Sequence, residues 1–84
     1  RQMCIRDSYQ SAFCKAPEPM HANNLALVYA EGKGVKQNPS YAYALYNLSG
    51  DTRAKHGMMM LDEMLSADQK QQAQTLNMRE ILCK

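Results

Sequence analysis

Two helical periods joined by a short turn lie between residues 23 and 50, and they constrain the fold more than any other feature of the chain. In the first period, small and apolar residues recur at spacings of three and four, which places them on one side of a helix of about 3.6 residues per turn. These residues are Ala22, Leu25, Ala26 and Tyr29. The opposite side of the same helix carries Asn24, Leu27 and Glu31. This segment is therefore predicted to be an amphipathic helix.

Two glycines end the first helix. Gly32 and Gly34 are separated by a single residue, and each lowers the helix preference by about 1 kcal/mol relative to alanine. We expect Gly32 to adopt the left-handed conformation that commonly ends a helix. Gly34 should permit a close approach of the chain, so that Val35 turns back toward the core.

The pair Asn38-Pro39 predicts the start of a second helix. The Asn38 side chain can accept a hydrogen bond from a free backbone N–H group, and Pro39 suits the first helical position because it lacks an N–H group. One face of this helix should then be buried, and it is made of Ala42, Leu45, Tyr46 and Ser49. Tyr43 and Asn47 are predicted to point away from that face. The short link predicts an antiparallel hairpin in which Tyr29 and Leu45 meet.

The segment LALVYAEGKGVKQNPSYAYALYNLS resembles one Sel1-like repeat, a helix-turn-helix unit related to tetratricopeptide repeats. The matching positions are Leu25, Ala26, Tyr29, Gly32, Gly34, Val35, Ala42 and Tyr46. Asn38 stands where the family usually has Asp and Leu45 where it often has Trp, and both residues can keep the capping and core roles. Ser49-Gly50 departs from the alanine pair that the family has there. The resemblance covers roughly a third of the chain.

The resemblance implies an all-α fold in which antiparallel helix pairs stack as an α-solenoid, with about four helices in this chain. Helical-pair repeats of about 34 to 47 residues need about three copies to cover their apolar faces, so further repeats of the same parent chain are expected. Without a preceding repeat, the N-terminal side of the first helix should be exposed.

The chain is divided into four segments on this basis. Residues 1–8, RQMCIRDS, resemble a translated sequencing-adapter string and are predicted to be non-native. Residues 9–20 are assigned to a remnant of a preceding repeat or to a linker, in which Pro17 and Pro19 break any helix. Residues 21–50 are the Sel1-like repeat, and residues 51–84 are predicted to be C-terminal capping helices.

A third helix is predicted after Asp51-Thr52, which can cap it. Its inward face is made of Ala54, Met58, Leu61 and Leu65. Gly57 lowers the helix preference of this segment. The methionines at 58–60 and 64 suggest a soft-metal site or an adaptable binding groove, but methionine at helical spacing fills a core far more often. Met59 and Met60 are the two that the core does not need.

A fourth helix is predicted from Ser66 to about Leu82. Ser66 and Gln69 form the capping-box pattern, in which each side chain accepts a hydrogen bond from the backbone N–H group of the other residue. The segment MLSADQKQQAQTLNMRE also resembles the tail that often closes bacterial Sel1-like proteins.

The three cysteines, Cys4, Cys14 and Cys83, are odd in number and widely spaced, which is not a disulfide framework. Some Sel1-like proteins join each helical pair by a disulfide, but those cysteines lie within the repeat, and residues 23–50 contain none. We therefore expect buried or idle thiols rather than a bridge.

Composition and motifs exclude several classes of function. The net charge is +2 and the lysines and arginines are scattered, which argues against nucleic acid, and no apolar run approaches the roughly 18 residues of a membrane span. Gly32-Lys33-Gly34 lacks the spacing of a phosphate-binding loop. No residue pattern places a nucleophile beside a base, so no catalytic residue, cofactor or metal site is predicted.

The remaining hypotheses are a protein-binding module and a structural cap. In the first, which the resemblance implies, the outward residues Asn24, Leu27 and Glu31 contact another protein or a peptide on the concave side of a longer solenoid. In the second, the chain is the C-terminal cap of that solenoid and has no ligand site of its own. A binding surface should show a groove beside Asn24 and Leu27, whereas a cap should leave that side polar, shallow and covered by the last helix.

Overall fold

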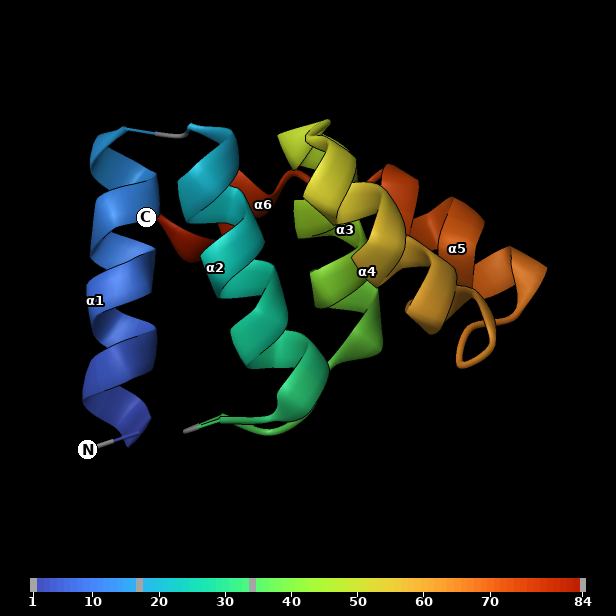
Figure 1. Cartoon of the computed structure of the whole chain (residues 1–84), viewed down its shortest axis with the longest axis horizontal. Coiled ribbons are helices and arrows are strands. Elements are labelled where there is room, and N and C mark those ends of the chain that lie inside the picture. The colour runs from blue at the N-terminus through green and yellow to red at the C-terminus, as the bar shows by residue number, and fades with distance from the viewer. Residues whose placement is uncertain (1, 17, 34, 84) are drawn as a thin grey trace.

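A computed structural model describes the backbone of residues 2–16, 18–33 and 35–83, and the side chains within these ranges from Arg6 onward. The described residues form six helices and no strand, so the all-α class is confirmed, while the expected number of about four helices is wrong. The helices are α1 (Gln2–Lys15), α2 (Pro19–Glu31), α3 (Pro39–Ser49), α4 (Thr52–Asp62), α5 (Ala67–Gln74) and α6 (Met78–Leu82), as Figure 1 shows.

The hairpin of α2 and α3 is the most extensive helix pair of the molecule, and its helices run antiparallel (Figure 1). Gly32 ends α2 in the left-handed conformation, with φ of 72°, as predicted. The loop then satisfies the last carbonyl groups of α2: Gln37 Nε2 donates to Ala30 O over 2.8 Å, and Asn38 N donates to Tyr29 O over 2.9 Å. Val35 packs half-buried against the core, while Gly34 lies outside the described residues.

The start of α3 follows the predicted chemistry. Asn38 Oδ1 accepts a hydrogen bond from Tyr41 N over 3.1 Å, and Pro39 occupies the first turn. α3 is the central helix, because α2, α4, α5 and α6 all pack against it. Tyr43 is therefore buried, and the prediction that it points away from the core is wrong. Asn47, which was also predicted to point away, is exposed.

The core draws one large, fully buried side chain from each of four helices. These are Phe13, Leu25, Leu45 and Met78. Tyr29 is buried in the same cluster as Leu45, and its ring meets the Tyr41 ring edge-on, with centroids 5.4 Å apart. Ala22, Ala26, Ala42 and Tyr46 were also predicted to face the core, and they belong to this cluster as well.

Helix α1 covers the side of α2 that was expected to be exposed. It packs directly on α2, and its Phe13 is fully buried in the common core. The expectation of an open N-terminal flank is therefore wrong. The backbone of α1 also runs without a break across the boundary between residues 8 and 9, and the predicted non-native origin of residues 1–8 stays a prediction.

The segment after Ser66 forms two helices where one was predicted. The capping box is present: Ser66 Oγ accepts from Gln69 N over 3.2 Å, and Gln69 Oε1 accepts from Ser66 N over 2.9 Å. The helix that it starts ends at Gln74, and a new helix, α6, starts where Asn77 Oδ1 accepts a hydrogen bond from Glu80 N over 3.1 Å. Ala73 and Met78 then reach the core from different helices.

A disulfide joins Cys14 of α1 to Cys83, which directly follows α6, with the two Cα atoms 5.5 Å apart. The expectation of idle thiols is therefore wrong for this pair. The two cysteines are 69 residues apart, and only the packing of α6 beside α1 brings them together. Gln10 Nε2 reinforces this contact by donating to Leu82 O over 2.6 Å.

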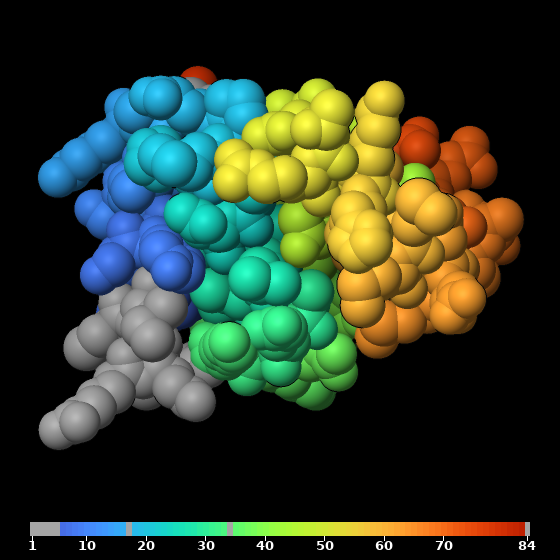
Figure 2. Space-filling model, in the orientation of Figure 1, coloured from blue at the N-terminus to red at the C-terminus, as the bar shows by residue number. Residues whose placement is uncertain are grey.

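The molecule is rounded rather than elongated (Figure 2). Its principal extents are 31, 24 and 22 Å, and its radius of gyration is 11.6 Å. Stacking into a longer solenoid stays a prediction. Within the described ranges, no helix has the length and apolar character needed to cross a membrane.

Candidate functional site

The three residues predicted to contact a partner all lie on the outer side of α2. Leu27 leaves 46% of its surface exposed, which is high for a leucine, and Asn24 beside it is half-buried. Glu31 is exposed at the C-terminal end of the helix, where its carboxylate pairs with Lys33 Nζ at 3.0 Å. The outer side of α2 thus offers an apolar centre with polar neighbours.

A recess of about 200 Å³ opens beside Asn24 and Leu27. Its remaining lining residues come from three helices: Asn23 from α2, Tyr46 from α3 and Arg53 from α4. Figure 2 shows the same side of the molecule, on which α2 in cyan and green lies beside α4 in yellow. The sequence pattern identified two of the five lining residues as surface contacts, and it assigned Tyr46 to the core alone.

Tyr46 forms the floor between the core and the recess. Only 7% of its surface is exposed, and burial raises the pKa of its hydroxyl above the ordinary 10.0, with the nearby Glu31 carboxylate adding to the increase. The ring lies against Gly57 of α4, where a Cβ atom would stand 2.5 Å from the ring carbon Cζ. The absence of a side chain at Gly57 is what lets this ring lie there.

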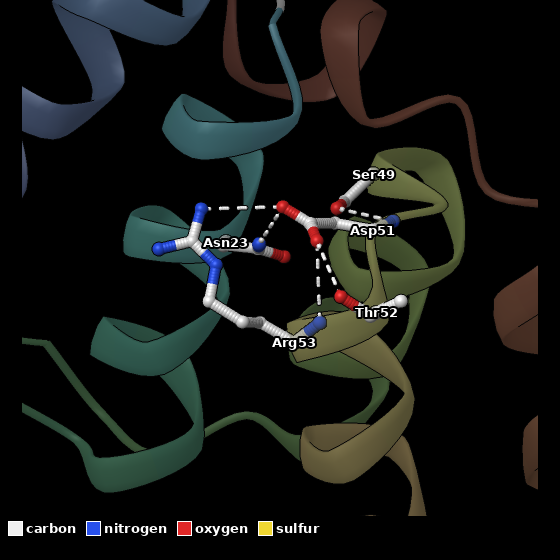
Figure 3. Close-up of polar contacts among 5 residues, drawn as sticks. All are labelled: Asn23, Ser49, Asp51, Thr52 and Arg53. Carbon is white, nitrogen blue, oxygen red and sulfur yellow. Dashed lines mark hydrogen bonds and ion pairs between the residues drawn. The ribbon is translucent and has the colours of Figure 1, made fainter.

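Asp51 holds the two sides of the recess together (Figure 3). Its Oδ1 accepts from Arg53 N and from the Thr52 hydroxyl, each over 3.2 Å, which caps α4 as predicted. Its Oδ2 accepts from Arg53 Nη2 over 3.2 Å and from Asn23 Nδ2 of α2 over 3.4 Å. The hydrogen bonds from Arg53 are the main reason that the pKa of Asp51 lies below its ordinary 3.8.

The two polar atoms of the Asn23 side chain differ in their contacts: Nδ2 donates one long hydrogen bond, and Oδ1 accepts none among the described residues. Its amide nitrogen faces the Asp51 carboxylate, and the reverse orientation would place two oxygen atoms against each other. The opposite atom, Oδ1, is buried without a hydrogen-bond partner among the described residues. A buried acceptor of this kind favours any rearrangement that brings a donor to it.

The chemistry of the recess suits recognition. Its lining consists of two amides, a leucine, a tyrosine and an arginine, and contains no carboxylate, imidazole or thiol. Its volume also lies below the roughly 300 to 1,000 Å³ of small-molecule and cofactor pockets. In the part of the chain that the structure describes, no three His, Cys, Asp or Glu side chains are grouped closely enough to hold a metal ion.

Larger depressions lie along α1, beside α6, and between α3 and α4. One of about 510 Å³ is lined by short or charged side chains, those of Asp7, Ser8, Ser11, Ala12 and Lys15. Another of about 300 Å³ lies beside the disulfide. An exposed leucine next to the recess distinguishes the α2 face from the two depressions along α1.

Comparison with protein-family models, curated proteins and solved structures finds no match to this chain. The resemblance of residues 21–50 to a Sel1-like repeat therefore rests on the residue pattern alone.

Proposed function

We propose that this chain is a non-catalytic protein-interaction module that binds a peptide segment of another protein on the outer face of α2. The observation that carries the proposal is the recess beside the half-exposed Leu27. Its size suits a side chain of a peptide better than a cofactor. No cofactor, nucleic acid or metal is needed for this role.

The lining residues suggest how a peptide is held. Leu27 supplies the apolar contact, and the amide of Asn24 can both donate and accept hydrogen bonds to a peptide backbone. Arg53 lines the recess and supplies a positive charge, which favours a partner with an acidic side chain at that position. Glu31 lies at the C-terminal end of α2, where it is paired with Lys33. The Arg53 guanidinium is already paired with Asp51, so it orients a ligand more than it strengthens binding.

The finer proposal is that α2 and α3 form one Sel1-like repeat within a longer α-solenoid of the parent chain. The left-handed Gly32, the Asn38 cap and the antiparallel packing of α2 on α3 support it. In such a solenoid, helices of successive repeats line a continuous concave surface, and the α2 face would contribute one unit of it.

A structural cap is the second candidate, and the disulfide favours it. Cys14 and Cys83 fasten the last helix to the first, which closes one end of the molecule. Terminal repeats of solenoids need such closure because no neighbour covers them. This role requires no ligand at the α2 face, so the two candidates differ in a measurable way.

The test is a selection of peptides from a random display library against the whole chain, followed by affinity measurements on variants. The first variant carries Asn24→Ala, Leu27→Ala and Glu31→Ala. We expect it to lose about 1 to 3 kcal/mol of binding free energy, or about 5- to 150-fold in affinity, because one anchor residue typically contributes that much. Its helix content should be unchanged, since alanine is the best helix former.

A matched control variant carries the same three residue types elsewhere on the surface. Asn47→Ala, Leu48→Ala and Glu63→Ala change exposed positions on α3 and directly after α4, and Leu48 is 53% exposed. This variant should bind the selected peptides as the wild type does. A selection that yields no peptide, or peptides that bind all three proteins equally, would contradict the binding proposal and leave the cap.

A further inference from the structure

The methionine run of α4 is divided between the core and the solvent. Leu61 is buried and Met58 packs half-buried against the core, so the inward face of α4 is complete without the two residues between them. Met59 and Met60 are 67% and 66% exposed. The two adjacent thioethers of Met59 and Met60 thus face outward and have no packing role. In this they differ from Met58, which helps to fill the core.

His56 lies on the same outward side of α4. At about 100° per residue, His56, Met59 and Met60 occupy an arc of about 100° on the helix surface. Side chains on a helix lean toward its N-terminus, so Met59 and Met60 lean over the turn that carries His56. His56 is exposed, and among the described residues it makes no hydrogen bond or ion pair that would hold it elsewhere.

We propose that His56, Met59 and Met60 form a surface site for a soft monovalent metal ion, Cu(I) or its analogue Ag(I). Thioether sulfur is a soft ligand that selects Cu(I), and imidazole nitrogen also binds copper well. One imidazole and two thioethers form a three-coordinate set, and the long, unbranched methionine side chains can adapt to it. Carboxylates are not required, and none of the three side chains lines the recess beside α2.

The test is a titration of the whole chain with silver nitrate in chloride-free buffer, monitored through the methyl signals of methionines labelled with ¹³C. A Cys4→Ser background removes the thiol outside the disulfide, which would bind a soft metal more tightly than a thioether. We expect the Met59 and Met60 methyl signals and the His56 ring signals to shift together and to saturate at one equivalent of silver.

Two variants make the result specific. Because even a change outside the ligand set lowers metal affinity by about 10- to 100-fold, the double change Met59→Leu and Met60→Leu should weaken silver binding by about 100-fold or more. Leucine keeps the helix, and circular dichroism confirms folding. The matched control is Met20→Leu, because Met20 is 50% exposed and stands next to His21 but has no second methionine beside it.

The control should bind silver as the background protein does. Equal affinity in the Met59→Leu, Met60→Leu variant and the background protein would overturn the proposal. Parallel shifts of the Met20 and Met64 methyl signals without saturation would overturn it as well, since they would show that silver binds any exposed methionine.

Discussion

At the residue scale, Gly57 illustrates how a close approach can outweigh helix preference. Replacing a helical glycine by alanine normally gains about 1 kcal/mol. Here the added Cβ atom would lie 2.5 Å from Cζ of the buried Tyr46 ring, so the ring or the helix must move. Overpacking of this kind costs about 1 to 3 kcal/mol. The steric cost of the added Cβ atom therefore exceeds the gain in helix preference.

We predict that Gly57→Ala lowers the free energy of unfolding by about 1 kcal/mol, measured by urea denaturation. The control is the same change in a Tyr46→Leu background, which removes the ring. There Gly57→Ala should be neutral or stabilising by up to about 1 kcal/mol. Equal destabilisation in both backgrounds would show that the ring contact is not the cause.

Asp51 predicts a specific pH dependence. Its pKa is lowered in the folded chain, mainly by the hydrogen bonds from Arg53, so its charged form favours the folded state. The Asp51 charge contributes fully to folding stability above the ordinary pKa of 3.8, and this contribution is lost as the pH falls through the lowered pKa of the folded chain. Asp51→Asn keeps an acceptor for the cap but removes the charge. The stability difference between wild type and Asp51→Asn should therefore shrink below pH 3.8, and a difference that does not vary with pH would refute this.

At the element scale, the sequence predicted the helix ends that depend on a local residue. It did not predict which helices pack against one another. Gly32 and Asn38 set the boundaries of α2 and α3 through their own conformation and side chain, which the sequence displays. Tyr43 was misplaced because α3 packs against four other helices, three of which arrive from later in the chain. Asn77 was missed as a cap because a single helix was predicted to continue from Ser66 to about Leu82.

Two left-handed glycines among the described residues permit a paired prediction on helix ends. Gly32 and Gly50 have φ of 72° and 65°, and a side chain there costs about 1 to 2 kcal/mol. A Cβ atom on Gly32 would also lie 3.2 Å from Gln37, whereas one on Gly50 meets nothing within 4 Å. Gly32→Ala should therefore destabilise the chain more than Gly50→Ala does, measured as the shift in the midpoint of thermal unfolding. An equal or larger effect at Gly50 would contradict this account of the loop.

At the scale of the whole molecule, the disulfide is the strongest constraint on the chain. It links residues 69 apart, and closing a loop of that length in the unfolded chain contributes about 4 kcal/mol. Small domains have a total stability of about 5 to 15 kcal/mol, so this is a large share. The sequence offered no signal for it, because the pairing of Cys14 with Cys83 follows from the packing of α6 beside α1.

We predict that Cys14→Ser with Cys83→Ser lowers the free energy of unfolding by about 4 kcal/mol and speeds amide exchange in α6. The control is the wild type treated with a phosphine reductant, which should match the double variant. A free energy of unfolding that does not change on reduction would show that the disulfide neither stabilises the folded state nor constrains the unfolded chain.

The candidate site itself was predictable in part. Asn24 and Leu27 follow from the outward side of one amphipathic helix, whereas Arg53 and Asn23 join them only because α4 packs beside α2.

The central claim is that the surface formed by α2 and α4 around the recess binds a peptide. The most direct measurement is an ¹H–¹⁵N correlation spectrum of the chain titrated with a selected peptide. We predict that the largest amide shifts fall on Asn23, Asn24, Leu27 and Arg53, and shifts concentrated instead on α1, α5 or α6 would contradict the account.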